Sequence, residues 1–181
     1  MESRRHNNSL LILLLGTMLP GAAQAPSADE YQVKAAYLYN FAKFVDWPAQ
    51  TFDSPEQAIV FCVLGQTPLS QPLRDALGGK VVDQRPLVFR PLADSKQAGK
   101  CQVLFISLPD PKHLRQTLGE VRFLNILTVG EGEDFTNQGG IVSLVLDAGR
   151  VRLAFNVDAA DDAKLHVSSK LLSLGMRKAG K

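Results

Sequence analysis

Three short, largely apolar runs constrain the fold of this chain most strongly. They cover residues 58–64 (AIVFCVL), 101–107 (CQVLFIS) and 124–129 (LNILTV). Runs of this length are typical of strands that are buried on both faces, as in a parallel sheet. Residues 80–82 and 87–92 predict two further strands around a turn. Because helix patterns separate the buried runs, the order of the elements predicts an alternating α/β fold.

Residues 28–47 predict an amphipathic helix that precedes the strands. Its apolar side chains recur every three or four residues, so they are expected to share the face that packs on the core. Pro48 ends this helix. Residues 69–77 and 111–121 predict two shorter helices, one after each of the first two buried runs. The predicted core-facing residues of the first helix are Val33, Tyr37, Phe41 and the pair Phe44/Val45.

The last part of the chain predicts an antiparallel hairpin followed by a helix. Residues 141–147 and 151–156 form the hairpin, and alternation of apolar and polar residues predicts that one of its faces is exposed. Residues 130–140 are expected to be a polar loop, and residues 168–176 a final helix with a serine cap. Together these elements predict one α/β domain, with a mostly parallel central sheet, a C-terminal antiparallel hairpin and flanking helices.

The first 25 residues have the organisation of a secretory signal peptide. Two arginines near the N-terminus precede an uncharged run of ten residues, 10–19, and small residues follow it. A membrane-spanning helix needs about 20 apolar residues, so a cleaved signal is favoured over a membrane anchor. Cleavage is expected after Ala23 or Ala25, and residues 26–181 then form a single domain outside the cytoplasm.

The charge of the mature chain argues against a nucleic-acid partner. Removal of residues 1–25 takes away two arginines and one glutamate, which lowers the formal charge from +2 to about +1. A near-neutral domain lacks the electrostatic footprint that nucleic acid requires. Residues 163–181 nevertheless carry five Lys/Arg residues and no acid. They are either a solvated basic end or a contact for an acidic partner or a membrane surface.

The chain contains two cysteines, Cys62 and Cys101, and both lie in the predicted mature part. An even number of cysteines in an exported protein favours one disulfide over two buried thiols. Each cysteine belongs to or adjoins a buried strand, so a bond between them would join two strands. Such a bond would be structural, or a redox switch if it is strained or accessible.

No common catalytic or cofactor-binding motif is present in the sequence. Residues 129–134 (VGEGED) lack the third glycine of a dinucleotide-binding loop and are interpreted as a turn. Its acids, Glu131, Glu133 and Asp134, could hold a cation or simply be solvated. His113 and His166 have no histidine or cysteine at ligand spacing. The sequence therefore predicts no catalytic residue, no metal site and no cofactor.

Four segments resemble the YfiR family of Gram-negative periplasmic proteins. The resemblance covers essentially the whole mature chain, and the first segment is the most specific because of its aromatic spacing and its terminal Trp-Pro. The segments are residues 30–48 (EYQVKAAYLYNFAKFVDWP), 101–107 (CQVLFIS), 139–151 (GGIVSLVLDAGRV) with Phe155 and Asn156, and 165–174 (LHVSSKLLSL).

The resemblance implies a non-catalytic periplasmic regulator that acts by protein–protein contact. In such systems the protein represses an inner-membrane diguanylate cyclase through its sensor part, which limits cyclic-di-GMP and biofilm formation. An outer-membrane-associated lipoprotein relieves the repression. The protein itself could be a monomer or a homodimer. Cys62 and Cys101 fit the longer-spaced cysteine pair of the family. A second pair found in some relatives is absent, since that region here offers Thr136 and Ser143.

The final helix and the hairpin before it are hypothesised to form the partner surface, with Arg152, Lys170, Arg177 and Lys178 on its polar rim. The competing interpretation is that this helix only closes the sheet. An alternative function is that of a periplasmic small-ligand-binding module. Its crevice would lie at the carboxyl ends of the strands, between residues 65–68, 107–110 and 130–134. A cryptic hydrolase is a third and weaker hypothesis.

We predict that protein recovered from the periplasm begins at Gln24 or Pro26, because signal peptidase cuts after the small residues that follow the apolar run. Intact-mass spectrometry measures this directly. Retention of Met1 on folded, exported protein would contradict the prediction.

Overall fold

The computed structural model describes residues 28–178 of the chain. The predicted signal peptide and both cleavage positions lie outside this range, so they stay predictions. Within residues 28–178, every helix is too short or too polar to cross a bilayer.

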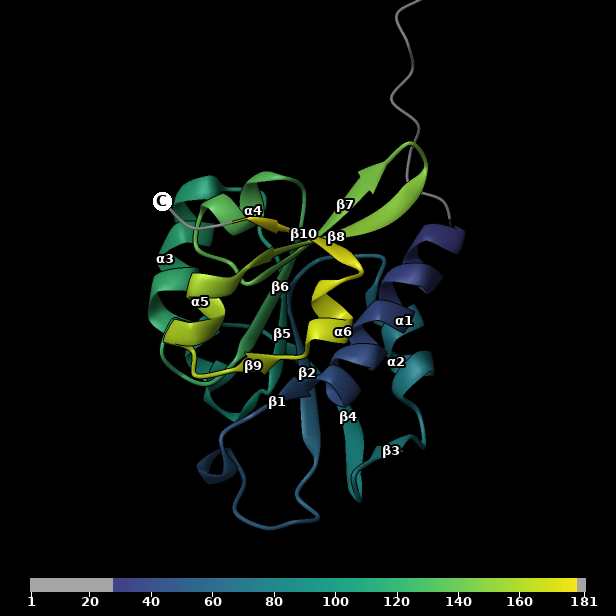
Figure 1. Cartoon of the computed structure of the whole chain (residues 1–181), viewed down its shortest axis with the longest axis vertical. Helices are drawn as coiled ribbons and strands as arrows, with labels where there is room; N and C mark the ends of the chain where they lie inside the picture. The colour runs from purple at the N-terminus through teal and green to yellow at the C-terminus, as the bar shows by residue number, and fades with distance from the viewer. Residues whose placement is uncertain (1–27, 179–181) are drawn as a thin grey trace, which may run out of the picture.

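The described residues form a twisted, eight-stranded sheet at the centre of the domain (Figure 1). Strands β4, β2, β5, β6 and β7 run parallel to one another, whereas β8 pairs antiparallel with β7 and β3 antiparallel with β4. In spatial order the strands are β10 (Gly175–Lys178), β8 (Arg150–Asn156), β7 (Val142–Asp147), β6 (Leu127–Glu131), β5 (Val103–Ser107), β2 (Ile59–Gly65), β4 (Arg85–Leu92) and β3 (Val81–Val82).

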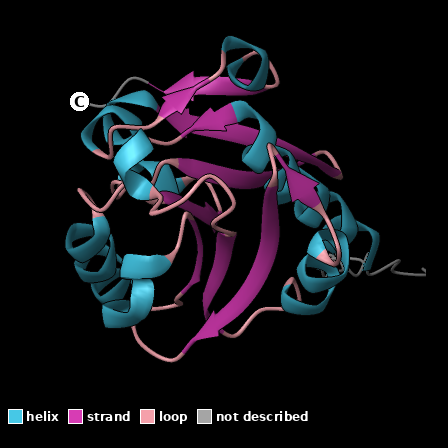
Figure 2. Ribbon diagram, turned by 90° about the horizontal axis from the view of Figure 1, so that it is seen from below, coloured by secondary structure: helices cyan, strands magenta, loops and turns pink. Residues whose placement is uncertain are grey.

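Helices cover both faces of this sheet, as Figure 2 shows. One core contains side chains of α1 (Ala28–Phe44), α2 (Ser70–Leu77), α5 (Val157–Asp162) and α6 (Ser169–Leu172). The opposite core contains those of α3 (Pro111–Val121), the 3-10 helix η2 (Ser95–Lys100) and α4 (Asp134–Asn137). Outside the main sheet, β1 (Val45–Asp46) pairs with β9 (His166–Val167), and a second 3-10 helix, η1 (Ala49–Thr51), follows β1. The predicted α/β fold class is confirmed.

The core-facing side of α1 differs from the predicted one. Phe41 is fully buried as expected, but Val33 is 45% exposed. The buried stripe is displaced and includes Lys34, Ala35 and Leu38. The prediction failed at Val33 because it counted apolar residues only, whereas a lysine occupies a core-facing position one residue later.

Residues 130–140 are not simply a polar loop. They contain the short helix α4, whose Phe135 is buried against the core below α3. A Cβ atom at Gly130 or Gly140 would overlap the Phe135 ring, so both glycines are required by this close packing. The strand before the loop also begins later than predicted, at Leu127, and Leu124 is 47% exposed.

The predicted helix over residues 168–176 is wrong in its second half. Ser168 caps α6 by accepting a hydrogen bond from the Leu171 backbone N–H, as expected. However, α6 ends at Leu172, and Gly175–Lys178 form β10, which pairs parallel with β8. Pairing with a strand distant in sequence overrides the local helix pattern here, and it extends the sheet beyond the hairpin.

An ion-pair cluster fixes α1 against the end of β6. The Lys34 ammonium contacts the Glu30 carboxylate one helical turn earlier, and its Nζ lies 2.7 Å from Oε1 of Glu131 in β6. Lys34 and Glu30 are buried, whereas the Glu131 side chain is 36% exposed. Burial alone would lower the pKa of Lys34, but its hydrogen bonds to Glu131 and Glu30 outweigh burial, so the pKa is raised.

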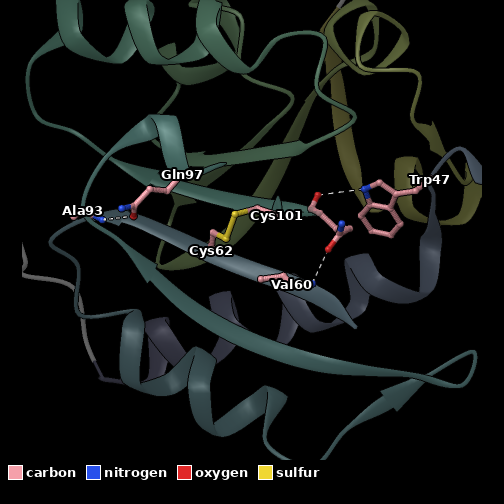
Figure 3. The surroundings of a disulfide bond; sticks show 7 residues. Trp47, Val60, Cys62, Ala93, Gln97 and Cys101 are labelled. Atoms are coloured by element: carbon pink, nitrogen blue, oxygen red, sulfur yellow. Dashed lines mark hydrogen bonds between the residues drawn. A yellow bond between two sulfur atoms is a disulfide. The ribbon is translucent and has the colours of Figure 1, made fainter. Parts of the chain in front are cut away.

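The Cys62–Cys101 disulfide joins β2 to the residues that lead into β5 (Figure 3). The predicted bond is therefore present, with 5.9 Å between the two Cα atoms. The cysteines are only 1% and 2% exposed and belong to the core beneath α3. Because reductants and partner thiols cannot reach a buried bond, this geometry favours the structural interpretation over a redox switch.

Gln102, the neighbour of the disulfide, links the same strands to the Trp-Pro segment after α1. Its backbone carbonyl accepts a hydrogen bond from Trp47 Nε1 at 3.2 Å, and its side-chain Oε1 accepts one from the Val60 backbone N–H at 2.8 Å (Figure 3). The Gln102 amide is thus buried with a backbone partner. These contacts explain why a tryptophan follows α1.

We expect Lys34→Met to lower the free energy of unfolding by roughly 2–4 kcal/mol, because it leaves the buried Glu30 carboxylate without its cation. Urea denaturation measures the change. Lys43→Met on the same helix is the control, since Lys43 is exposed and should contribute less than about 1 kcal/mol. Equal losses in the two variants would show that the cluster does not stabilise the docking of α1.

Replacing both cysteines by serine should cost about 4 kcal/mol, the closure entropy of a loop with 39 residues of sequence separation. In the native parent protein, a thiol reagent added with mild reductant should label neither cysteine, and unfolding in guanidinium should make both reactive. Rapid reduction of the bond in the folded protein would instead support a redox role.

Candidate partner-binding site

The β7–β8 hairpin, α6 and β10 lie at one end of the main sheet. Among the described residues, β10 is the outermost strand and no strand pairs with its free side. Beside it, the β7–β8 hairpin projects past the body of the domain, near the N-terminal end of α1 (Figure 1). Tyr37 Oη in α1 donates to the Val151 carbonyl of the hairpin at 3.5 Å. This side, formed by β8, β10, α5 and α6, is called the C-terminal face below.

The four basic residues predicted to contact a partner belong to three elements of this part of the chain, β8, α6 and β10. Arg152 lies on β8, 51% exposed, and its Nε donates to Asp147 Oδ2 at 2.6 Å. Lys170 is exposed on α6, with its Nζ 5.3 Å from the centre of the Phe44 ring. Arg177 and Lys178 occupy β10 opposite Phe155 and Asn156. Their role in binding stays a prediction.

A small apolar cavity of about 150 Å³ opens on the same face. It lies where β8, α5, β9 and α6 meet. Hydrophobic side chains dominate its wall, and three polar residues complete it. The apolar residues are Ile141, Phe155, Val157, Ala160, Leu165, Val167 and Leu172, and the polar residues are Asn156, Asp161 and His166.

Asn156 builds this cavity by starting α5, a helix that the sequence analysis missed. Its Oδ1 accepts from the Ala159 backbone N–H at 3.0 Å, as an N-cap residue does, and its Nδ2 donates to the Thr136 carbonyl at 3.0 Å. The signal was present in the sequence, since an asparagine precedes a segment with Asp158 in its first turn. The sequence analysis treated Asn156 only as the last residue of a strand, and helix α5 was therefore not predicted.

Two large apolar side chains in the C-terminal part of the chain are exposed. Leu174, between α6 and β10, is 59% exposed, and Leu146 near the hairpin tip is 47% exposed. Leu174 directly precedes Gly175, which pairs with Leu153 of β8. Hydrophobic residues at a free sheet edge are a feature of contact surfaces.

At the carboxyl ends of β2 and β5, two of the loops predicted to border a ligand crevice contact each other directly. The Ser107 hydroxyl donates to the Gln66 carbonyl at 2.9 Å, which draws the two loops together. A Cβ atom on Gly65 would overlap the Ser107 carbonyl. The next loop along the sheet follows β6, and Lys34 of α1 forms an ion pair with Glu131 where this loop begins.

Two of the three acidic residues at the end of β6 and in the loop after it contact neighbouring side chains. Glu131 pairs with Lys34, and Asp134 Oδ1 accepts from Asn137 Nδ2 at 3.2 Å. Across residues 28–178, no three His, Cys, Asp or Glu residues gather in a way that could hold a metal ion.

The comparisons with known proteins point to one family. A conserved domain protein from Vibrio cholerae O1 biovar El Tor has a similar structure, with a TM-score of 0.55 and 13% identity over 81% of this chain and 59% of that one. This chain therefore spans about three-fifths of the Vibrio protein's length. At this identity the likeness concerns the fold alone.

The ABC domain from Streptococcus pneumoniae, solved in complex with L-Trp, gives a TM-score of 0.46 at 7% identity over 65% of this chain and 54% of that one. No curated protein matches the sequence. The sequence model of the YfiR/HmsC-like family matches residues 31–176. That family comprises regulatory, non-catalytic periplasmic proteins that act on a partner protein. The chain belongs to the YfiR/HmsC-like family.

Proposed function

We propose that this protein is a periplasmic regulator that binds the sensor part of an inner-membrane protein through its C-terminal face. The observation that carries the proposal is the apolar cavity where β8, α5, β9 and α6 meet. Protein interfaces combine a hydrophobic centre with a polar rim. Here the cavity and Leu174, two residues after the cavity-lining Leu172, supply the centre, and Lys170 of α6 supplies an exposed cation. Arg152 lies on the other face of β8 from the cavity-lining Phe155 and pairs with Asp147.

The size of the cavity favours a protein partner over a free ligand at this place. Sites for drug-sized molecules enclose about 300–1,000 Å³, whereas this cavity has about 150 Å³. That volume suits one apolar or aromatic side chain of a partner. Such anchor side chains, inserted into a pocket near the centre of an interface, carry much of the binding energy.

The partner we propose is the periplasmic domain of a diguanylate cyclase. The support comes from the family, whose members regulate cyclic-di-GMP signalling. Binding on the periplasmic side would hold the cyclase in a state with low cyclic-di-GMP synthesis, and biofilm formation would be restrained. An outer-membrane-associated lipoprotein would relieve the block by competing for the regulator. The protein needs no catalytic residue or cofactor for this task.

Leu174→Glu should weaken binding to the cyclase's periplasmic domain at least tenfold, because it places a charge at the apolar centre of the proposed interface. Reversing Lys170, Arg177 and Lys178 to glutamate should weaken binding further, and more strongly at low salt. Titration calorimetry with the purified periplasmic domain measures both effects. Melting temperature should change little in Leu174→Glu, since this side chain is 59% exposed.

Leu124→Glu is the matched control, since Leu124 is 47% exposed at the end of α3. Its binding should equal that of the parent protein. If Leu174→Glu and the charge-reversed variant also bind like the parent, the C-terminal face is not the interface. The exposed side of α1 around Val33 is then the next surface to test.

A further inference from the structure

A basic groove lies at the other end of the sheet from the C-terminal face. It has a volume of about 580 Å³ and lies between the carboxyl-terminal half of β4 and the 3-10 helix η2. Its wall carries three cations and no acidic residue. The lining residues are Arg90, Leu92, Lys96, Gln97, Gly99 and Lys100.

The three cations of the groove form no close ion pair among the described residues, and Lys96 has an electrostatic interaction with nearby acids, Asp94 and Glu120. In the part of the chain that the structure describes, the ion pairs involve Lys34, Arg122 and Arg152, and none reaches Arg90, Lys96 or Lys100. Gln97 uses its Oε1 to accept from the Ala93 backbone N–H at 3.4 Å, so its amide N–H₂ can donate to another group. Like charges held close together repel, and an anion bound among them would relieve this repulsion.

The disulfide holds this arrangement in place. The bond joins Cys62 of β2 to Cys101, which directly follows Lys100. Cys62 is the register partner of Arg90 in the neighbouring strand β4, so the bond anchors the end of the η2 loop beside the strand on which β4 pairs. Figure 3 shows Gln97 and Ala93 beside the sulfur atoms. The groove is therefore preorganised, which lowers the entropic cost of binding.

Two carboxylates near η2 stabilise the loop from outside the groove. Asp94 accepts from the Lys96 backbone N–H at 2.9 Å and caps η2, and this bond lowers the pKa of Asp94. Glu120 of α3 accepts from the Ser95 hydroxyl at 2.6 Å, which lowers the pKa of Glu120. Both carboxylates also interact electrostatically with Lys96, which lowers their pKa further. Neither of them lines the groove, whose wall carries Arg90, Lys96 and Lys100.

We propose that this groove is a binding site for a phosphate monoester group. The guanidinium of Arg90 can bind two phosphate oxygens at once, and the ammonium groups of Lys96 and Lys100 can balance the remaining charge. A volume of about 580 Å³ is within the range of small-molecule sites. An extended acidic protein segment would need a longer basic track than this one loop offers.

The site is separate from the proposed partner surface. Five strand-to-strand steps, from β4 through β2, β5, β6 and β7 to β8, lie between the two places in the sheet. At about 4.8 Å per step this is roughly 24 Å. The side chains of Arg90 and Cys62 share the face covered by α3, whereas α6 packs on the opposite face.

Titration calorimetry with glycerol 3-phosphate tests the proposal on the mature protein with its disulfide intact. The parent should bind it with submillimolar affinity, bind inorganic phosphate as well, and fail to bind glycerol. Gly99→Asp should weaken binding at least tenfold, because it places a carboxylate among the cations. A Cβ atom at Gly99 meets no atom within 4 Å, so the fold should be unaffected. Arg90→Gln should weaken binding similarly.

Ala36→Asp is the control, since it adds the same charge at an exposed position of α1 and should leave binding unchanged. Co-sedimentation with vesicles that contain phosphatidic acid, a lipid with a phosphate monoester headgroup, distinguishes the source of the phosphate. If the protein binds the vesicles and Gly99→Asp abolishes this binding, the ligand is a lipid headgroup. If the protein binds glycerol 3-phosphate but does not bind the vesicles, the ligand is a soluble molecule. The proposal is overturned if the parent binds neither, binds only an acidic peptide, or loses no affinity in Gly99→Asp and Arg90→Gln.

Discussion

The pairing of β2 with β5 is the constraint on which the rest of the structure depends. Both strands are buried on both faces, and they place β4 on one side and β6 on the other. The disulfide and the Gln102 hydrogen bonds join these strands where β5 begins. Because a disulfide cross-links the residues of this centre, the two ends of the sheet can carry different surfaces without destabilising the fold. One end presents an apolar cavity and a free strand edge, and the other a basic groove.

Buried polar groups define how the helices dock on this centre. Lys34 could have been replaced by an apolar residue in a simpler core, but its contacts with Glu30 and Glu131 specify the position of α1 along β6. A buried ion pair is weak evidence for stability and better evidence for a defined register. Trp47 also helps to define the position of α1, because its side-chain N–H, just after the C-terminal end of the helix, donates to the Gln102 carbonyl. The segment from α1 to Trp47 is therefore fixed to the sheet at both of its ends.

The central strands could be predicted from the sequence because apolar runs such as residues 59–64 leave few alternatives to a buried strand. The disulfide followed from cysteine number and compartment. The C-terminal face could be predicted only in outline. Formation of β10 depends on β8, about 20 residues away in sequence, and residue patterns carry no information on such pairing. The cavity was missed because it requires α5, and the basic groove because Arg90 and Lys100 line one hollow only after β4 and η2 have packed together.

The central claim is that the protein acts from the periplasm to restrain cyclic-di-GMP synthesis. Measuring cellular cyclic-di-GMP in a deletion strain tests it most directly, with complementation by the full chain or by a version lacking residues 2–25. The account predicts that deletion raises cyclic-di-GMP, that the full chain restores the low level, and that the unexported version does not. An unchanged level on deletion, or full restoration by the unexported version, would contradict it.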